Sequence, residues 1–197
     1  MPPEDFLKRG MDAFIHGDLR HLFLFLDFDG TLVSIQNDPA ACSLSPRVKD
    51  QLTNIALSGL VSIAILSGRS LSDIRKKVPI KGIYYGGNHG LEIAGPRIRF
   101  VHPEARSMKP TIDRVCQRIA KAIRNLEGVF IEEKHLSFTL HYRMASRQGK
   151  VLARQAFHTI LSEESDGHAL KVIRGKKVLE LAPDVAWDKG RAALLIL

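Results

Sequence analysis

Two aspartates, Asp27 and Asp29, come directly after a continuous apolar run over residues 22–26. The run is short and rich in aromatic side chains, which predicts a strand buried on both faces inside a parallel sheet. Because side chains alternate along a strand, both carboxylates point the same way while Phe28 points back to the core. Adjacent carboxylates repel unless a divalent cation or a shared proton lies between them. The pair therefore indicates metal binding, proton transfer or both, and an acidic turn that ends a strand is the simpler alternative.

Three further residues at the ends of predicted strands or at the start of a predicted helix could take part in phosphate binding. Gly30 permits a positive φ and brings bare backbone amides close to whatever the carboxylates hold. Ser67 follows a second apolar run, residues 60–66, and its hydroxyl fits either a phosphate oxygen or the N-cap of the next helix. Lys189 opens the last helical pattern; alone it is most simply a surface lysine, and beside two strand-end carboxylates its ammonium would neutralise a carboxylate and a phosphate oxygen. Open α/β sheets bind ligands at the carboxyl edge of their strands, so we expect these groups to meet there.

The string Asp27-Phe28-Asp29-Gly30-Thr31-Leu32 resembles the first motif of the haloacid dehalogenase superfamily of phosphatases. The resemblance implies that Asp27 is the nucleophile, that Asp29 is the general acid and base, and that both residues bind Mg2+. Ser67-Gly68-Arg69 resembles the second motif of the superfamily, and Lys189 resembles the third. The phosphate-binding residues that this resemblance implies are Ser67, Gly68, Lys189, Gly30 and Thr31.

A narrower resemblance concerns the substrate. Residues 86–92 (GGNHGLE) and the strings around residues 132–134, 141–143 and 175–180 resemble trehalose-6-phosphate phosphatases. This implies hydrolysis of trehalose 6-phosphate to trehalose and phosphate, with a trehalose-phosphate synthase as a possible partner. Ala182-Pro183 departs from the family, which often has Arg or Lys before that Pro. The implied substrate-binding residues are Asn88, His89, Glu132, Lys134, Arg143, Lys176 and Glu180.

The predicted elements fall into two groups that would position these residues. Periodicity and capping signals predict helices over residues 46–57, 71–78, 111–126, 151–161 and 191–197, and a short amphipathic helix or a turn over residues 1–20. Strands are predicted over residues 22–26, 60–66, 83–85, 130–134 and 136–143, the last with one wet face, and hairpins over 93–101 and 170–181. Strand alternation would also place five charged residues on a common sheet face, although exposed sheet faces are usually charged. These residues are Glu132, Lys134, Arg143, Lys176 and Glu180.

These elements predict an α/β protein with two domains. A Rossmannoid parallel-sheet core of the haloacid dehalogenase type would comprise residues 1–105 and 184–197. An inserted α+β cap, which the resemblance makes the C2B type, would comprise residues 106–183. Acids and bases on one cap face suit the hydroxyls of a sugar better than a bare phosphate.

Composition limits the classes of partner. The formal net charge is +8, and residues 106–183 hold 15 Lys and Arg against 8 Asp and Glu. The positive field of this segment would concentrate a small anion, and a solvated basic surface is the alternative for most of these residues taken singly. The aromatic and basic interleaving typical of nucleic-acid binding is absent from the sequence. No apolar run approaches the roughly 20 residues of a membrane span, and no signal peptide opens the chain, so we expect a cytoplasmic protein. Cys42 and Cys116 lack disulfide or metal spacing and are predicted to be free thiols.

The fourth motif of the superfamily, an acidic loop that completes the Mg2+ site, is not found before Leu197. This predicts a core truncated at its C-terminus with an open sheet edge, and a short protein with a degenerate metal site is the alternative. Two other functions stay open. One is a phosphatase for another sugar phosphate, such as sucrose phosphate or mannosylphosphoglycerate. The other is a non-catalytic domain that binds a sugar phosphate or a synthase.

Overall fold

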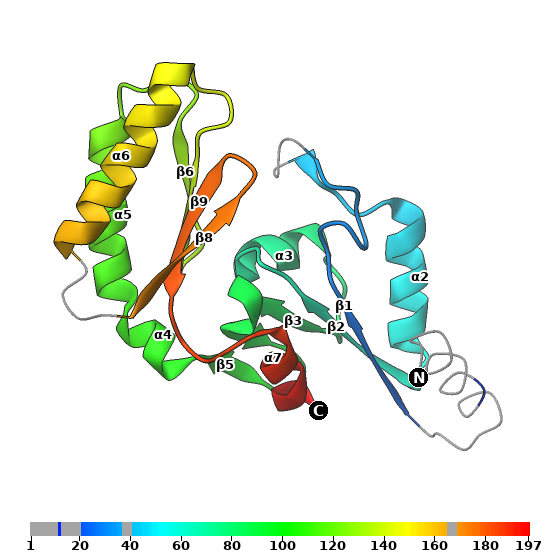
Figure 1. Ribbon diagram of the computed structural model, residues 1–197. Helices are drawn as coiled ribbons and strands as arrows, with labels where there is room; N and C mark the ends of the chain where they lie inside the picture. The colour runs from blue at the N-terminus through cyan, green and yellow to red at the C-terminus, as the bar shows by residue number, and fades with distance from the viewer. Residues whose placement is uncertain (1–11, 13–20, 37–40, 165–168) are drawn as a thin grey trace. The chain divides into compact units, whose positions relative to one another are not determined.

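The computed structural model describes residues 12, 21–36, 41–164 and 169–197 (Figure 1). The chain divides into two compact units. The first unit contains the chain up to Arg99 together with Asp188–Leu197, and the second contains Phe100–Trp187. The second unit thus extends beyond the predicted 106–183 at both ends. The helix or turn predicted over residues 1–20 lies, apart from Asp12, outside the described residues.

The first sheet has five strands in the order β1-β2-β3-β4-β5. β1 pairs with β2 and β2 with β3 in parallel, whereas β4 is antiparallel to β3. The three parallel strands and the hairpin predicted over residues 93–101 are therefore present. The strand bounds are Leu22–Leu26 for β1, Val61–Leu66 for β2, Tyr84–Gly87 for β3, Glu92–Ala94 for β4 and Arg99–Val101 for β5.

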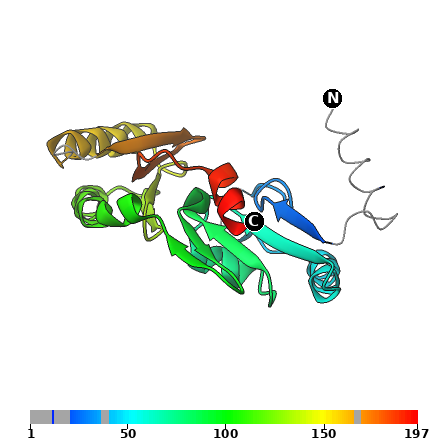
Figure 2. The same cartoon turned by 90° about the horizontal axis from the view of Figure 1, so that it is seen from below.

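Two helices cover one face of this sheet, and a third lies on the other side, as Figure 2 shows. On the first face α2 (Pro46–Leu57) and α3 (Leu71–Lys77) join a core that includes Phe28. Ser45 caps α2 by accepting from the amide of Val48, as the Ser-Pro start predicts. The third helix, α7 (Lys189–Ile196), packs against β3 and the short 3-10 helix η2 (Asn88–Gly90).

The position of β1 differs from the prediction. Within the described residues β1 pairs with β2 alone, and all five of its side chains are half-buried rather than buried on both faces. Phe23 and Phe25 point to one face, where their rings stack with centroids 6.2 Å apart, and Phe23 also contacts Tyr84 at 6.4 Å. Aromatic residues at alternate positions can therefore cover one another on a single sheet face. In the described part of the chain β1 is therefore an edge strand, which differs from the interior position that its apolar run predicts and fits the open sheet edge that the missing fourth motif predicts.

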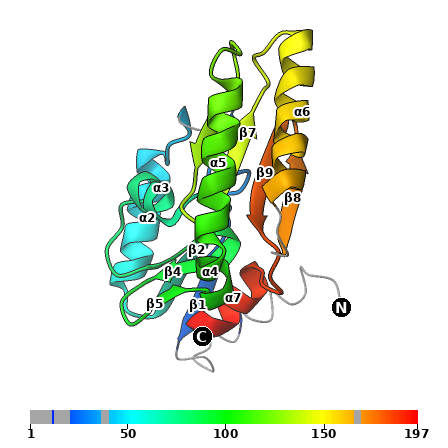
Figure 3. The same ribbon diagram turned by 90° about the vertical axis from the view of Figure 1, so that its left-hand side faces the viewer.

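The second unit is an antiparallel sheet in the order β6-β7-β9-β8 with two long helices. Figure 3 shows α5 and α6 running side by side in front of this sheet. The short helix α4 was not predicted, and Pro103 opens it with His102 as N-cap. The bounds are Pro103–Ser107 for α4, Lys109–Ile123 for α5, Phe130–Glu133 for β6, Phe138–His141 for β7, Arg147–Glu164 for α6, Leu170–Gly175 for β8 and Val178–Pro183 for β9.

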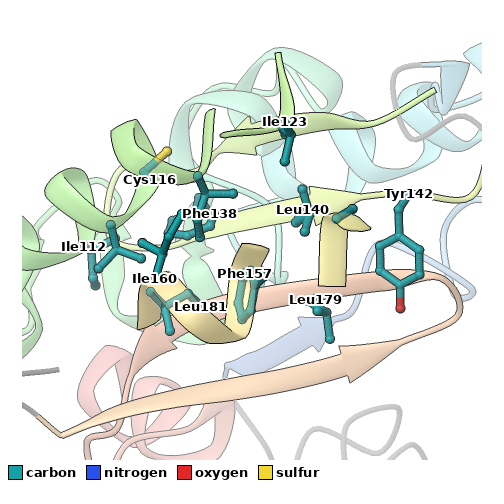
Figure 4. Packing of buried hydrophobic residues seen from close by; sticks show 13 residues of the cluster. Ile112, Cys116, Ile123, Phe138, Leu140, Tyr142, Phe157, Ile160, Leu179 and Leu181 are labelled. Atoms are coloured by element: carbon teal, nitrogen blue, oxygen red, sulfur yellow. The ribbon is translucent and has the colours of Figure 1, made fainter. Parts of the chain in front are cut away.

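Apolar side chains from both helices and the sheet form the core of the second unit (Figure 4). Phe138 of β7 and Phe157 of α6 are both essentially inaccessible, and their rings meet edge to face at 6.1 Å. Each such side chain contributes about 1.5–3 kcal/mol through burial. Cys116 lies in this core and Cys42 in that of the first unit, and both are free thiols as predicted.

Among the described residues, no helix is both long enough and apolar enough to cross a bilayer.

Candidate active site

The strand register brings three predicted site segments to one edge of the first sheet. Leu26 is aligned with Ile65, and Leu66 with Gly86, so β1, β2 and β3 end together. Asp27, Ser67 and Asn88 follow these three ends. Phe28 is completely buried, as expected for a side chain that points away from the two carboxylates beside it. The edge therefore gathers the motifs that are far apart in the sequence.

Asp27 forms an ion pair with Lys189. The Lys189 Nζ donates to Asp27 Oδ1 over 2.6 Å, and the two side chains are 37% and 41% exposed. Lys189 is the first residue of α7, whose start is fixed by Asp188, the N-cap that accepts from the amide of Arg191. The ammonium thus reaches the end of β1 from the opposite end of the chain. Partial exposure leaves the pair open to an incoming anion.

Asp29 forms a bidentate pair with Arg69, a residue to which the sequence analysis assigned no role. Arg69 Nε donates to Oδ2 over 2.8 Å and Nη2 to Oδ1 over 2.7 Å, while Nη1 binds Asp73. Burial by itself lowers the pKa of Arg69, but the bonds to Asp29 and Asp73 outweigh it and raise the pKa above its usual value. The guanidinium also lies 5.3 Å from the ring centroid of Phe28.

The sequence carried a signal for Arg69 in the string Ser67-Gly68-Arg69. An arginine at the carboxyl end of a buried strand needs carboxylate partners, since an unpaired buried charge is costly. Asp29 lies at the end of the neighbouring strand and Asp73 lies one helical turn further on. The fork of the guanidinium fits a carboxylate at two points, which fixes the rotamer of Asp29.

Ser67 and Gly68 form the bottom of the site. Ser67 is almost fully buried, and its Oγ accepts from the amide of Arg69 over 3.1 Å. The N-cap of α3 is Ser70, whose Oγ accepts from the amide of Asp73, so the alternative of Ser67 as N-cap is wrong. A Cβ at position 68 would lie 2.7 Å from Cε1 of the exposed His89 ring, so a larger residue there would displace that ring.

Asn88 and His89 adopt left-handed backbone conformations with φ of 50° and 58°. Such conformations are costly for residues other than glycine and persist where the surroundings hold them. The Asn88 amide donates to Arg69 O over 2.7 Å, and its Nδ2 donates to Glu92 Oε2 over 2.5 Å. The His89 amide donates to Ser67 O over 3.0 Å, and the imidazole is exposed. Both predicted residues therefore lie beside the second motif.

The amides expected to be bare after Asp29 are already engaged. Gly30 has the predicted positive φ of 87°, and its N–H donates to Val33 O over 2.8 Å. The Thr31 N–H donates to Phe28 O over 3.4 Å, and the residue is exposed. The turn satisfies its own backbone groups, since an unpaired amide is costly. The prediction of free amides at Gly30 is therefore wrong.

Oxygen donors suited to a hard cation are present at Asp27. Its Oδ1 is bound to Lys189, and no described residue donates a hydrogen bond to Oδ2. Mg2+ is commonly held by one or two carboxylates together with water and substrate phosphate, so this half-exposed carboxylate fits. The described residues contain no group of three or more His, Cys, Asp or Glu side chains that could hold a metal by themselves.

In the second unit, a polar cluster surrounds the carboxylate of Glu180. Glu180 accepts from Lys134 Nζ over 3.0 Å, from Ser137 Oγ over 2.9 Å and from Thr139 Oγ1 over 3.4 Å. The side chains of Lys134 and Glu180 are each only 11% exposed. Ser137 and Thr139 are buried as well, so the wet face predicted for residues 136–143 is wrong at these two positions.

The other predicted substrate residues of the second unit lie further apart. Glu132 Oε2 accepts from His141 Nε2 over 2.8 Å, and by strand register Glu132 shares a sheet face with Glu180. Arg143 donates to the backbone carbonyl of Lys176 over 3.1 Å. Lys176 itself is exposed in the turn between β8 and β9, and not on a strand. The common face predicted for these charges thus includes Glu132, Lys134 and Glu180.

Comparison with known proteins identifies the family. The trehalose-phosphatase family model matches residues 25–197. Trehalose-phosphate phosphatase of Mycobacterium tuberculosis is 36% identical over 177 residues, 88% of this chain and 43% of that protein. Probable trehalose-phosphate phosphatase D of Arabidopsis thaliana is 31% identical over 187 residues, 90% of this chain and 49% of that protein.

The fold has close counterparts among solved structures. A trehalose-6-phosphate phosphatase related protein superposes with a TM-score of 0.74 at 22% identity, over 89% of this chain and 72% of that one. That likeness shows the mixed α/β fold with its parallel-sheet core. The chain spans less than half of the length of the two relatives above. By its sequence match over residues 25–197, the chain belongs to the trehalose-phosphatase family.

Proposed function

We propose that the protein is a Mg2+-dependent phosphomonoesterase of the haloacid dehalogenase type that converts trehalose 6-phosphate into trehalose and phosphate. The observation that carries this proposal is the Asp27–Lys189 pair, 2.6 Å apart at the carboxyl edge of the sheet, in a chain of the trehalose-phosphatase family. The ammonium compensates the charge of the carboxylate, and an incoming phosphate can take over the ammonium. We place the reaction in the cytoplasm, where the two buried thiols stay reduced.

Asp27 is the proposed nucleophile. Its oxygen attacks phosphorus in line, the bond from phosphorus to the sugar oxygen breaks, and the electron pair goes to that oxygen. An aspartyl phosphate and free trehalose result. Lys189 then compensates the charge of the phosphoryl oxygens. The half-exposure of both side chains supports this role, because neither has to leave a buried position to meet the substrate.

Asp29 is the proposed general acid and base, and Arg69 positions it. Asp29 gives a proton to the leaving sugar oxygen, takes one from the attacking water, and the bond from Asp27 to phosphorus then breaks. Both oxygens of Asp29 accept from Arg69. One of these bonds has to open before that oxygen can carry a proton. The remaining bond and the contact of Arg69 with Asp73 keep the pair in place.

Phosphate is held, in this proposal, at the bottom of the site. Ser67 and Gly68 follow β2 directly beneath His89. The amides of Gly30 and Thr31 would donate to the phosphate after their hydrogen bonds to Val33 O and Phe28 O have broken. Asp27 and the backbone carbonyl of Asp29 would hold Mg2+, which when bound withdraws negative charge from the phosphate.

The sugar is assigned to Asn88, His89 and the second unit, which we propose to be the C2B cap of a haloacid dehalogenase core. Lys134 and Glu180 satisfy each other in a buried cluster. Glu132, Arg143 and Lys176 are half-buried or exposed and are therefore better able to reach hydroxyl groups. A sugar offers donors and acceptors together, which suits this mixture of acids and bases.

A panel of phosphorylated disaccharides tests the proposal, with release of inorganic phosphate as the measurement. We expect trehalose 6-phosphate to be hydrolysed with the highest kcat/KM, in the presence of Mg2+, and no hydrolysis after Asp27→Asn. Faster hydrolysis of sucrose phosphate or mannosylphosphoglycerate would overturn the substrate assignment and leave the reaction class intact. Hydrolysis that persists in the Asp27→Asn variant would overturn the mechanism.

A non-catalytic role is the second candidate, as a domain that binds a sugar phosphate or a trehalose-phosphate synthase. It is favoured by the lack, among the described residues, of a group of three side chains that could hold a metal. Calorimetry with trehalose 6-phosphate, with and without Mg2+, discriminates the two. Binding that is independent of Mg2+ and is followed by no release of phosphate supports the second candidate.

A further inference from the structure

A cavity lies at the edge of the first sheet opposite the candidate active site. It is open to solvent, has a volume of about 670 Å³ and is lined by the loop after α3 and the turn between β4 and β5. α3 begins beside Ser67 and ends at Lys77, and β3 begins at Tyr84. This loop therefore lies at the amino ends of the parallel strands. The cavity shares none of its lining residues with the motifs described above.

The floor of the cavity is apolar and held in one conformation. Ile80, Ile83 and Tyr85 line it, and each is at most 6% exposed. The Tyr85 hydroxyl accepts from the amide of Ile80 over 3.1 Å and lies 2.6 Å from the carbonyl oxygens of Val78 and Ile80. Burial raises the pKa of Tyr85, so the hydroxyl remains a donor at neutral pH. The loop wall is thus formed before any ligand arrives.

The rim of the cavity carries three cations from three segments. Arg75 comes from α3, Lys81 from the loop and Arg99 from β5, and all three are exposed. None of them has a carboxylate within ion-pair distance among the described residues, whereas Lys189 and Arg69 each hold an aspartate. Residues 74–91 and 93–103 contain neither Asp nor Glu. The positive charge around the cavity is therefore not neutralised locally.

We propose that this cavity binds a small phosphorylated molecule with a planar or apolar ring, the chemistry of a nucleotide. The volume falls in the range of about 300–1,000 Å³ that is usual for small-molecule sites. The apolar floor would cover the ring, and the three cations would hold the phosphate groups. Inorganic phosphate alone would leave the floor exposed to water. The site is separate from the proposed phosphatase reaction and does not depend on it.

Isothermal calorimetry on the whole chain with AMP, ATP and inorganic phosphate tests the proposal. We expect ATP to bind more tightly than AMP, because three cations face its phosphate groups, and both to bind more tightly than inorganic phosphate. Arg75→Glu and Lys81→Glu are each expected to weaken nucleotide binding about tenfold or more. Thermal unfolding of each variant checks that the fold is retained.

Arg97→Glu is the matched control. Arg97 is exposed in the same turn as Pro96 and Ile98 but does not line the cavity. Its charge reversal should change the affinity less than threefold, since an exposed charge outside the cavity is screened. The proposal is overturned if no nucleotide binds at millimolar concentration, if inorganic phosphate binds as tightly as ATP, or if Arg97→Glu weakens binding as much as Arg75→Glu. An acidic peptide that outcompetes ATP would also overturn it.

Discussion

The two units of the molecule hold their carboxylates in opposite ways. In the first unit, Asp27 is 41% exposed and its partner Lys189 is 37% exposed, whereas Asp29 is 38% exposed and is held by the buried Arg69. The exposed pair is therefore that of Asp27 with Lys189. In the second unit, Glu180 is 11% exposed and accepts from three side chains of its own sheet region. An exposed pair can exchange its partner for a ligand at small cost, whereas a buried one leaves an unpaired charge behind. The exposed cluster of the first unit is therefore suited to binding and catalysis, and the buried cluster of the second unit to stabilising the fold.

Asp27→Asn gives the sharpest expected effect on the exposed cluster. The amide is a poor nucleophile, so we expect kcat for trehalose 6-phosphate to fall by about 10⁴-fold or more. The free energy of unfolding should change by less than about 1 kcal/mol, because an exposed ion pair contributes little. Phosphate release and urea unfolding measure the two quantities. Asp50→Asn, an exposed position on α2, is the control and should change neither.

In contrast to Asp27→Asn, Glu180→Ala is expected to lower the free energy of unfolding. It removes the carboxylate that accepts from the buried ammonium of Lys134, and breaking a buried ion pair on one side costs about 3–5 kcal/mol of stability. The double variant Lys134→Met with Glu180→Leu should recover most of this loss, because it removes both charges. Urea unfolding of the three proteins is the measurement. A stable Glu180→Ala protein with a strongly raised KM would show that the cluster serves the substrate and not the fold.

Arg69→Lys removes the two-point contact with Asp29 and keeps the positive charge. We expect kcat to fall about 10- to 100-fold, because a small misplacement of a catalytic group has an effect of this order. KM should change little, since Arg69 is not assigned to the substrate. Steady-state kinetics separate the two parameters, and Arg47→Lys on the exposed side of α2 is the control. An unchanged kcat would mean that Asp29 is positioned by other groups.

The ionisation of the buried Cys116 thiol makes the stability of the second unit depend on pH. Burial raises the pKa of its thiol from 9.0 to about 11, with smaller contributions from nearby acids. The unfolded chain ionises first as the pH rises, so the contribution of Cys116 is complete below about pH 9 and is lost between pH 9 and 11. We expect stability to fall by up to about 1.4 kcal/mol per pH unit in this window. The slope should be smaller for Cys116→Val, and equal slopes would contradict the shift.

Local signals in the sequence were sufficient for most elements of the fold. Ser45-Pro46 starts α2, the period of the apolar residues defines α5, and the run before Asp27 defines β1. The apolar run of β1 by itself does not predict a place at the edge of the described sheet, because an aromatic run looks the same whether its second face is covered by another layer or by its own neighbours. Strand order is a property of long-range pairing, which a local pattern does not contain.

Site residues that belong to a motif of consecutive residues could be predicted from the sequence. Site residues whose role depends on a partner from another segment could not. Asp27 and Lys189 were grouped from their motifs, and the structure brings them together. Arg69 received no role, because its need for a carboxylate appears only when β1 and β2 lie side by side. The burial of Thr139 likewise follows from its register with Glu180 on β9. Pairwise contacts between strands were thus the missing information.

Trapping of the covalent intermediate tests the central claim most directly. The protein is mixed with trehalose 6-phosphate and Mg2+, quenched with borohydride, digested, and the peptide that contains Asp27 is analysed by mass spectrometry. Borohydride reduces an acyl phosphate to an alcohol, so the account predicts homoserine at position 27, only in the presence of substrate. An unmodified Asp27 peptide in a sample that is releasing phosphate, or reduction at Asp29 in its place, would contradict the account.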